Sequence, residues 1–83
     1  MVFNMNNEPI PLTALSRHKH GKIVQIIGGM GLQRKLRIMG IREGQKISIV
    51  SRQPFRGPLT ISINGNHLTI GRGMAFKILV EEI

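Results

Sequence analysis

The chain has 83 residues, and its twelve Lys and Arg residues against four Asp and Glu residues give a formal net charge of +8. A chain of this length forms one small domain, whose thin core leaves little room for an enclosed substrate cavity. The absence of cysteine excludes disulfides, thiolate zinc sites and cysteine nucleophiles, and the lack of any long apolar run excludes a membrane-spanning helix.

The chain opens with a polar, Asn-rich and patternless stretch, residues 1–8, which is predicted to be a flexible tail. The folded domain is therefore expected to span residues 9–83. At its start, Pro9 and Pro11 hold the backbone extended and exclude a central strand, because proline has no N–H to donate to a ladder. The next residues, 13–16, are predicted to form one helical turn.

One strand and one helix are predicted after this turn. Lys22–Ile27 is predicted to be a strand because β-branched residues dominate it. A glycine-rich break ends the strand. Residues 32–39 then carry Leu and Met at the spacing of a single helical stripe, which predicts a helix with that stripe against the core. Gly40 is suited to end the helix in a left-handed conformation.

The remaining chain is predicted to form four strands joined by tight turns, at Gln45–Ser51, Leu59–Ile63, His67–Ile70 and Phe76–Val80. The hairpin tip between the first two contains proline and glycine. Asn64-Gly65 is the strongest turn signal in the chain, because this dipeptide tolerates positive φ. Residues 71–75 are predicted to be a break between strands.

These elements predict a mainly β (α+β) fold, with five short strands and one short helix inserted between the first and second strands. A sheet of this size avoids exposed edges best by curling into a small barrel.

No catalytic group of residues is visible. Three of the four carboxylates lie near the chain ends, at Glu8, Glu81 and Glu82, and no Asp is present to orient a histidine. The glycine-rich stretch at 28–31 lacks the ending of a nucleotide-binding loop and is predicted to be a structural turn. The sequence therefore predicts a non-enzymatic protein that requires no cofactor.

The three histidines are the candidate metal ligands. His18 and His20 would point the same way on an extended segment and could both reach one ion, and His67 is the only other histidine. The basic residues around the first two repel a cation. We therefore expect surface histidines, with weak binding of Fe²⁺, Mn²⁺ or Zn²⁺ as the alternative.

Basic residues gather at two places, residues 17–22 and the exposed surface of the predicted helix, where Arg34, Lys35 and Arg37 lie. Such clusters indicate a polyanionic partner: nucleic acid, an anionic membrane face or an acidic protein surface. Tyr and Trp are absent, and Phe55 is the one aromatic expected to be exposed. The lack of a stacking platform argues against a single-strand binder.

The order of these motifs resembles the FeoA family, small cytoplasmic accessory proteins of bacterial and archaeal ferrous iron transport. The matching stretches are Pro11-Leu12-x-x-Leu15, Gly21-Lys22-Ile23-x-x-Ile26, Leu32-x-x-x-Leu36-x-x-Met39-Gly40-Ile41-x-x-Gly44, Pro54-Phe55-x-Gly57-Pro58 and Ile61-x-Ile63-x-Gly65. Family members commonly have a second glycine at the position of Arg56, so this chain is more basic than the pattern requires.

The resemblance implies an SH3-like barrel and a partner, the cytosolic region of a FeoB-type membrane GTPase transporter. It also implies a cytoplasmic protein held at the inner membrane face through that partner, with the anionic membrane surface as a further contact. Peptides usually lie on the loops and exposed apolar side chains of SH3-like barrels. The partner-binding residues are therefore expected to be Arg34, Arg37, Pro54, Phe55, Arg56, Gly57 and Pro58.

The sequence leaves open two hypotheses from other functional classes. The first is a small basic nucleic-acid-binding barrel, whose affinity would fall steeply with salt. The second is a transition-metal-binding sensor module that uses the three histidines. An open barrel edge would also allow a homo-oligomer.

Overall fold

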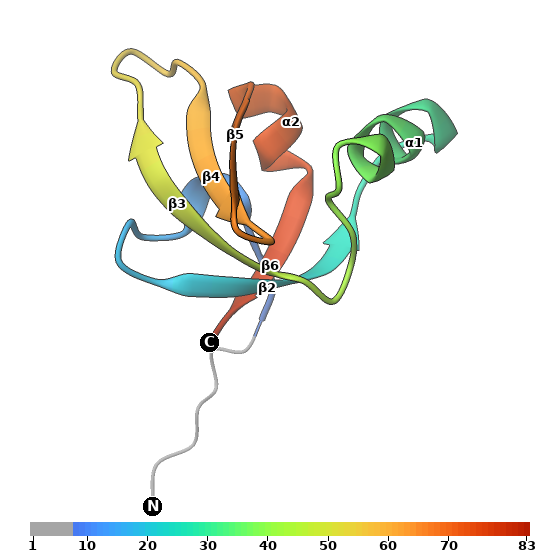
Figure 1. Cartoon of the computed structure of the whole chain (residues 1–83), viewed down its shortest axis with the longest axis horizontal. Coiled ribbons are helices and arrows are strands. Elements are labelled where there is room, and N and C mark those ends of the chain that lie inside the picture. Colours follow the sequence, from blue (N-terminus) through green and yellow to red (C-terminus); the bar gives the residue numbers. More distant parts are fainter. Residues whose placement is uncertain (1–7) are drawn as a thin grey trace, which may run out of the picture.

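A single antiparallel sheet curls around the core of the computed structural model, which describes residues 8–83 (Figure 1). Its strands are β1 (Ile10–Pro11), β2 (His20–Ile26), β3 (Lys46–Arg52), β4 (Leu59–Ile63), β5 (Asn66–Ile70) and β6 (Ile78–Glu82). They lie in the order β1-β6-β2-β3-β4-β5, so β1 and β5 are the two edges. The tail predicted for residues 1–8 lies outside the described residues, apart from Glu8.

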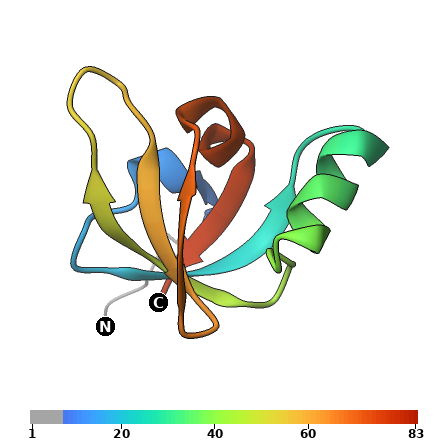
Figure 2. The ribbon, with the colours of Figure 1, turned by 45° about the horizontal axis from the view of Figure 1, so that its top comes forward.

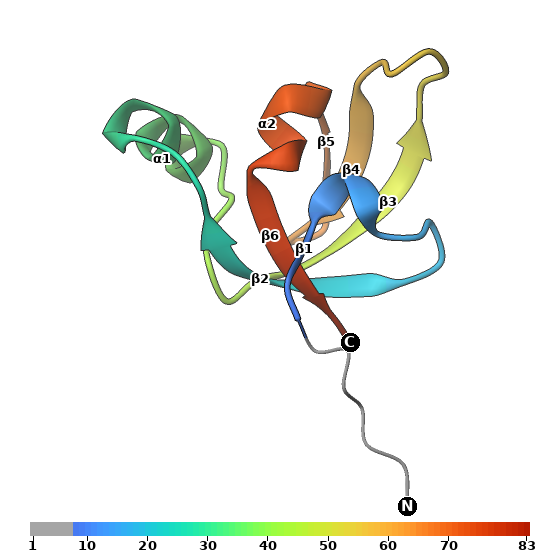
Figure 3. The same ribbon diagram turned by 180° about the vertical axis from the view of Figure 1, so that it is seen from behind.

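Three helical segments complete the fold: η1 (Leu12–Ala14), α1 (Met30–Ile38) and α2 (Arg72–Phe76). The helix α1 stands off one side of the barrel, between β2 and β3 (Figure 2). The short helix α2 packs against η1, and seen from behind the two cover one end of the barrel (Figure 3). Segments from the two ends of the chain therefore close the same opening.

The core is aliphatic throughout, and no polar or charged side chain among residues 8–83 is buried. Strand β4 shows how the sequence produces it: Leu59, Ile61 and Ile63 point inward and the residues between them do not. From α1 only Leu36 is fully covered, with Leu32 and Met39 packed against the same cluster. Burial of this apolar surface is the main driving force for folding.

The mainly β fold is confirmed, but the sheet has six strands rather than five. The additional strand is β1, in which Ile10 and Pro11 pair with Val80 and Leu79 of β6. A proline is tolerated there because β1 is an edge strand, whose outer side needs no ladder hydrogen bond. The helix predicted for residues 32–39 is observed as Met30–Ile38, and Gly40 follows it with a φ of 89°, as expected.

The prediction for residues 71–77 is wrong. The predicted break contains α2, and Phe76, expected to begin the last strand, ends that helix, so β6 begins at Ile78. The helix starts with an Ala75 N–H to Gly71 carbonyl hydrogen bond of 3.0 Å, and its Ala75 is completely buried. Five residues are too few to display a helical period, so packing against η1 decides this conformation.

One charged side chain fastens η1 to the sheet. Arg52, on β3, donates from Nη1 to the carbonyl oxygen of Thr13 at 3.2 Å and from Nη2 to that of Leu15. These bonds satisfy carbonyl groups at the C-terminal end of η1, which lack partners within the helix. Arg52 therefore serves the fold and is not one of the free surface cations.

Replacing Arg52 with alanine should lower the free energy of unfolding by about 2–3 kcal/mol, because hydrogen bonds from a charged donor to two carbonyl oxygens are lost. Urea denaturation followed by circular dichroism measures this change. The matched control is Arg42→Ala, since the Arg42 side chain is exposed and its hydrogen bonds, both to Gln45, come from its backbone. Equal midpoints for the two variants would show that Arg52 does not fasten η1.

Candidate functional site

The β3–β4 tip, residues 53–58, has an unusual backbone. Its turn is closed by a hydrogen bond of 3.2 Å from the Gly57 N–H to the Pro54 carbonyl oxygen. The two central residues, Phe55 and Arg56, have φ values of 59° and 61°. This left-handed conformation favours Asn and Gly and is strained for bulky side chains. The chain thus stores strain where it displays an aromatic and a cation.

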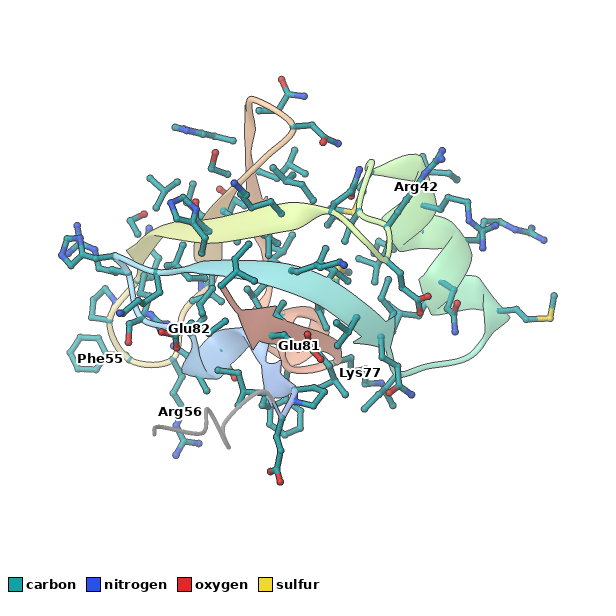
Figure 4. All side chains as sticks on the ribbon, turned by 90° about the horizontal axis from the view of Figure 1, so that it is seen from below. Arg42, Phe55, Arg56, Lys77, Glu81 and Glu82 are labelled. Atoms are coloured by element: carbon teal, nitrogen blue, oxygen red, sulfur yellow. The ribbon has the colours of Figure 1, made fainter. Side chains whose placement is uncertain are left out.

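Both of these side chains point away from the ribbon at the end of the barrel (Figure 4). Phe55 is 98% exposed, so it contributes nothing to the core. Backbone strain combined with an exposed aromatic is typical of a functional surface rather than of a folding element.

An open groove lies beside this tip, with a volume of about 660 Å³. Three elements distant in the sequence provide its walls: η1, the β3–β4 tip and α2 with the residue after it. The lining residues are Thr13, Arg56, Arg72, Gly73, Phe76 and Lys77. Its charged side chains are all cations, and its largest apolar one, Phe76, is 60% exposed.

Arg72 lines this groove, and one of its hydrogen-bond donors has no acceptor within the described residues. Its Nε atom is buried and has no hydrogen-bond partner among residues 8–83. Sequence reasoning missed Arg72, Phe76 and Lys77 as a group, because the predicted break hid the helix that presents them. The prediction that Phe55 is the one exposed aromatic is therefore wrong, because Phe76 is 60% exposed as well.

The outward face of α1 forms a second candidate surface. Met30 and Ile38 are 81% and 79% exposed, and Arg34, Lys35 and Arg37 are exposed beside them. This face lies on the other side of the barrel from the β3–β4 tip (Figure 1). The structure therefore does not bring the two groups of predicted partner-binding residues together.

The basic segment 17–22 is partly neutralised by the end of the chain. Lys19 Nζ lies 3.5 Å from Glu82 Oε2, and Lys22 is opposite Glu81 in the β2–β6 register. The sequence shows only that these glutamates lie near the end of the chain. Pairing across the sheet shifts the unopposed positive charge toward α1 and toward the groove.

The histidines do not converge. His20, Ser48, Ser62 and His67 form one row across four strands on the outer face of the sheet. His20 and His67 are separated by three strand spacings, roughly 14 Å, and side chains stand perpendicular to a sheet, so their imidazoles stay apart. His18 lies in the loop before β2. Within residues 8–83 no three His, Cys, Asp or Glu side chains gather as a metal site.

No helix within residues 8–83 has the length and apolarity needed to cross a bilayer.

Comparison with known proteins gives concordant matches. The FeoA domain family matches residues 10–82. Fe(2+) transport protein A of Methanocaldococcus jannaschii is 36% identical over 72 residues, which are 87% of this chain and 85% of that protein.

Two solved structures have the same fold. The crystal structure of an iron uptake regulatory protein (FeoA) has a TM-score of 0.83 and 32% identity, covering 92% of this chain and 100% of that one. The NMR structure of a FeoA-like protein from Clostridium acetobutylicum has a TM-score of 0.82 and 28% identity, with 92% and 88% covered. The predicted SH3-like barrel is thereby confirmed.

The backbone strain at the β3–β4 tip predicts how a substitution there changes the free energy of unfolding. Replacing Arg56 with glycine should raise the free energy of unfolding by roughly 0.5–1 kcal/mol, because relief of the left-handed strain exceeds the added entropy of the unfolded chain. The melting temperature should rise by about 3–6 °C.

The matched control makes the same substitution on an exposed face of α1. Arg34→Gly should lower stability by about 1 kcal/mol, because glycine is unfavourable inside a helix. A fall in melting temperature for both variants would contradict the assignment of strain to the tip.

Proposed function

The chain belongs to the FeoA family, and from that premise we propose that it is a non-enzymatic cytoplasmic accessory protein that binds the cytosolic region of a FeoB-type membrane GTPase transporter. Membership of the family implies a role in Fe(2+) transport. The proposal adds the mode of action, which is regulation through protein contact.

The observation that carries this proposal is the β3–β4 tip. Phe55 is 98% exposed on a turn whose backbone is unfavourable for it. Aromatic side chains supply much of the binding energy at protein interfaces, where they become buried against the partner. Burial of Phe55 against a partner would offset the backbone strain of the tip, which folding alone does not offset.

The outward face of α1 supports a second contact in this proposal. It combines the exposed Met30 and Ile38 with Arg34 and Arg37, and no acidic residue lies on the helix. Cations in such positions steer an acidic partner and raise the rate of association. The transporter's cytosolic region, or the anionic membrane face beside it, would supply the negative charge.

No cofactor enters the proposed contact, since both surfaces consist of apolar and cationic side chains. Weak binding of Fe²⁺, Mn²⁺ or Zn²⁺ by individual histidines would be a separate property. Calorimetry on a His18→Ala/His20→Ala variant tests it.

Binding to the purified cytosolic region of a FeoB-type transporter tests the main proposal. Phe55→Ala should weaken the affinity by about tenfold or more, through faster dissociation. Arg37→Glu should instead slow association and reduce its dependence on salt. His67→Ala, an exposed change on β5, is the control and should leave both rates unchanged. Absence of binding up to about 100 μM with the full chain would overturn the proposal.

A nucleic-acid-binding barrel predicts a different salt response. Filter retention of single- and double-stranded oligonucleotides should be weak and nearly independent of salt if protein contact is the function. Tight retention that falls steeply between two ionic strengths would favour nucleic acid, because each neutralised phosphate releases counterions.

A further inference from the structure

We propose that the groove between η1, the β3–β4 tip and α2 binds an acidic, extended peptide segment that carries a large apolar side chain. The inference deepens the proposed function. The identity of the protein that carries the segment rests on the proposed function. The chemistry of the segment follows from the groove alone.

The size of the groove is that of a ligand site. Its volume of about 660 Å³ lies within the range of about 300–1,000 Å³ that is usual for ligand sites. Phe76 remains 60% exposed there, although Ala75 beside it in α2 is completely buried. An aromatic ring left open to solvent in a concavity offers a partner apolar area to cover.

The charge of the groove defines what accompanies the apolar side chain. Arg56, Arg72 and Lys77 line it, and none of the three makes an ion pair within residues 8–83. No carboxylate lines the groove, and Glu82, at the end of β6, is already paired with Lys19. Three unopposed cations around an apolar surface complement a segment with several carboxylates.

Arg72 adds an independent indication. Its buried Nε has no hydrogen-bond acceptor in the described part of the chain, and a buried unpaired donor is costly. Guanidinium groups match carboxylates in a planar, two-bond geometry. Arg72 therefore lines the groove with hydrogen-bonding capacity that residues 8–83 do not use.

The backbone strain at the β3–β4 tip has a role in this arrangement. Arg56, whose backbone has the left-handed φ of 61°, is one of the residues that line the groove. A glycine would adopt that conformation more easily but would remove a cation. An arginine at a strained position that glycine would occupy more easily therefore favours charge recognition by the groove.

A peptide segment fits these features better than other polyanions do. A lipid surface is flat and would not enter a concavity, and a nucleic-acid backbone would require cations without an apolar floor. The groove offers both an apolar surface and cations within one small site.

The test titrates the full chain with a blocked, fluorescein-labelled peptide of sequence Gly-Glu-Glu-Leu-Phe-Glu-Glu-Gly, followed by anisotropy and by ¹⁵N chemical shifts. Two matched peptides replace all Glu by Gln, or Leu and Phe by Ala. We expect the first peptide to bind with shifts concentrated at Thr13, Arg56 and Arg72–Lys77, and each matched peptide to bind at least about tenfold more weakly.

Charge-reversed variants separate the groove from general attraction. Arg72→Glu should weaken the peptide at least about tenfold, whereas Arg42→Glu, the same charge change on the far side of the molecule (Figure 4), should leave it within about twofold because salt screens distant charges. Phe76→Ser is the second variant, and melting temperatures verify that each variant is folded. Equal losses for Arg72→Glu and Arg42→Glu would overturn the inference.

A binding measurement with the cytosolic region of the transporter distinguishes the two proposals. If the cytosolic region of the transporter binds and Arg72→Glu does not weaken it, the groove inference fails and the proposed function stands. If the peptide binds at the groove and the transporter does not bind the chain, the proposed function fails and the groove inference stands. Groove shifts produced by phosphatidylserine vesicles or an oligonucleotide, but not by the peptide, would also overturn the inference.

Discussion

The sheet of this small protein has two free edges and an aliphatic core, and the barrel must be closed over that core at one end. Leu12 and Leu15 from the beginning of the chain and Ala75 from near its end supply the cover, and all three are completely buried. Because η1 and α2 must meet for this closure, the residues around them meet as well. The groove is a consequence of how the core is sealed, and Arg52 holds one of its walls in place from β3.

The structure shows where the excess positive charge of the chain lies. Part of it is opposed across the sheet, where Lys19 pairs with Glu82. Arg52 is used by the fold. Six of the other cations gather on two surfaces, the outward face of α1 and the groove beside the β3–β4 tip, and each of these surfaces also exposes large apolar side chains. Cations and exposed apolar groups together are typical of protein contact, whereas cations alone would fit any polyanion.

Sequence reasoning succeeded where a local rule was strong. The alternation of Leu59, Ile61 and Ile63 predicted β4, and the Asn64-Gly65 turn is found with both residues at positive φ. It failed at residues 71–77, since a five-residue helix is too short to have a readable period and is stabilised by packing rather than propensity. The edge strand β1 was missed for a related reason: two residues have no alternation, and their pairing with β6 depends on a partner almost at the other end of the chain.

The sequence by itself determined the fold class, the family resemblance, the exposed basic face of α1 and the exposed tip at Phe55. These features depend on residue order within a few turns or strands, where periodicity and turn chemistry act. The tertiary structure alone decided that Arg56 lies beside Arg72, Phe76 and Lys77 and not beside Arg34 and Arg37, and that the histidines form a spread row. The physical reason is that sealing the core joins segments distant in the sequence, and no local pattern encodes which surfaces that closure brings together.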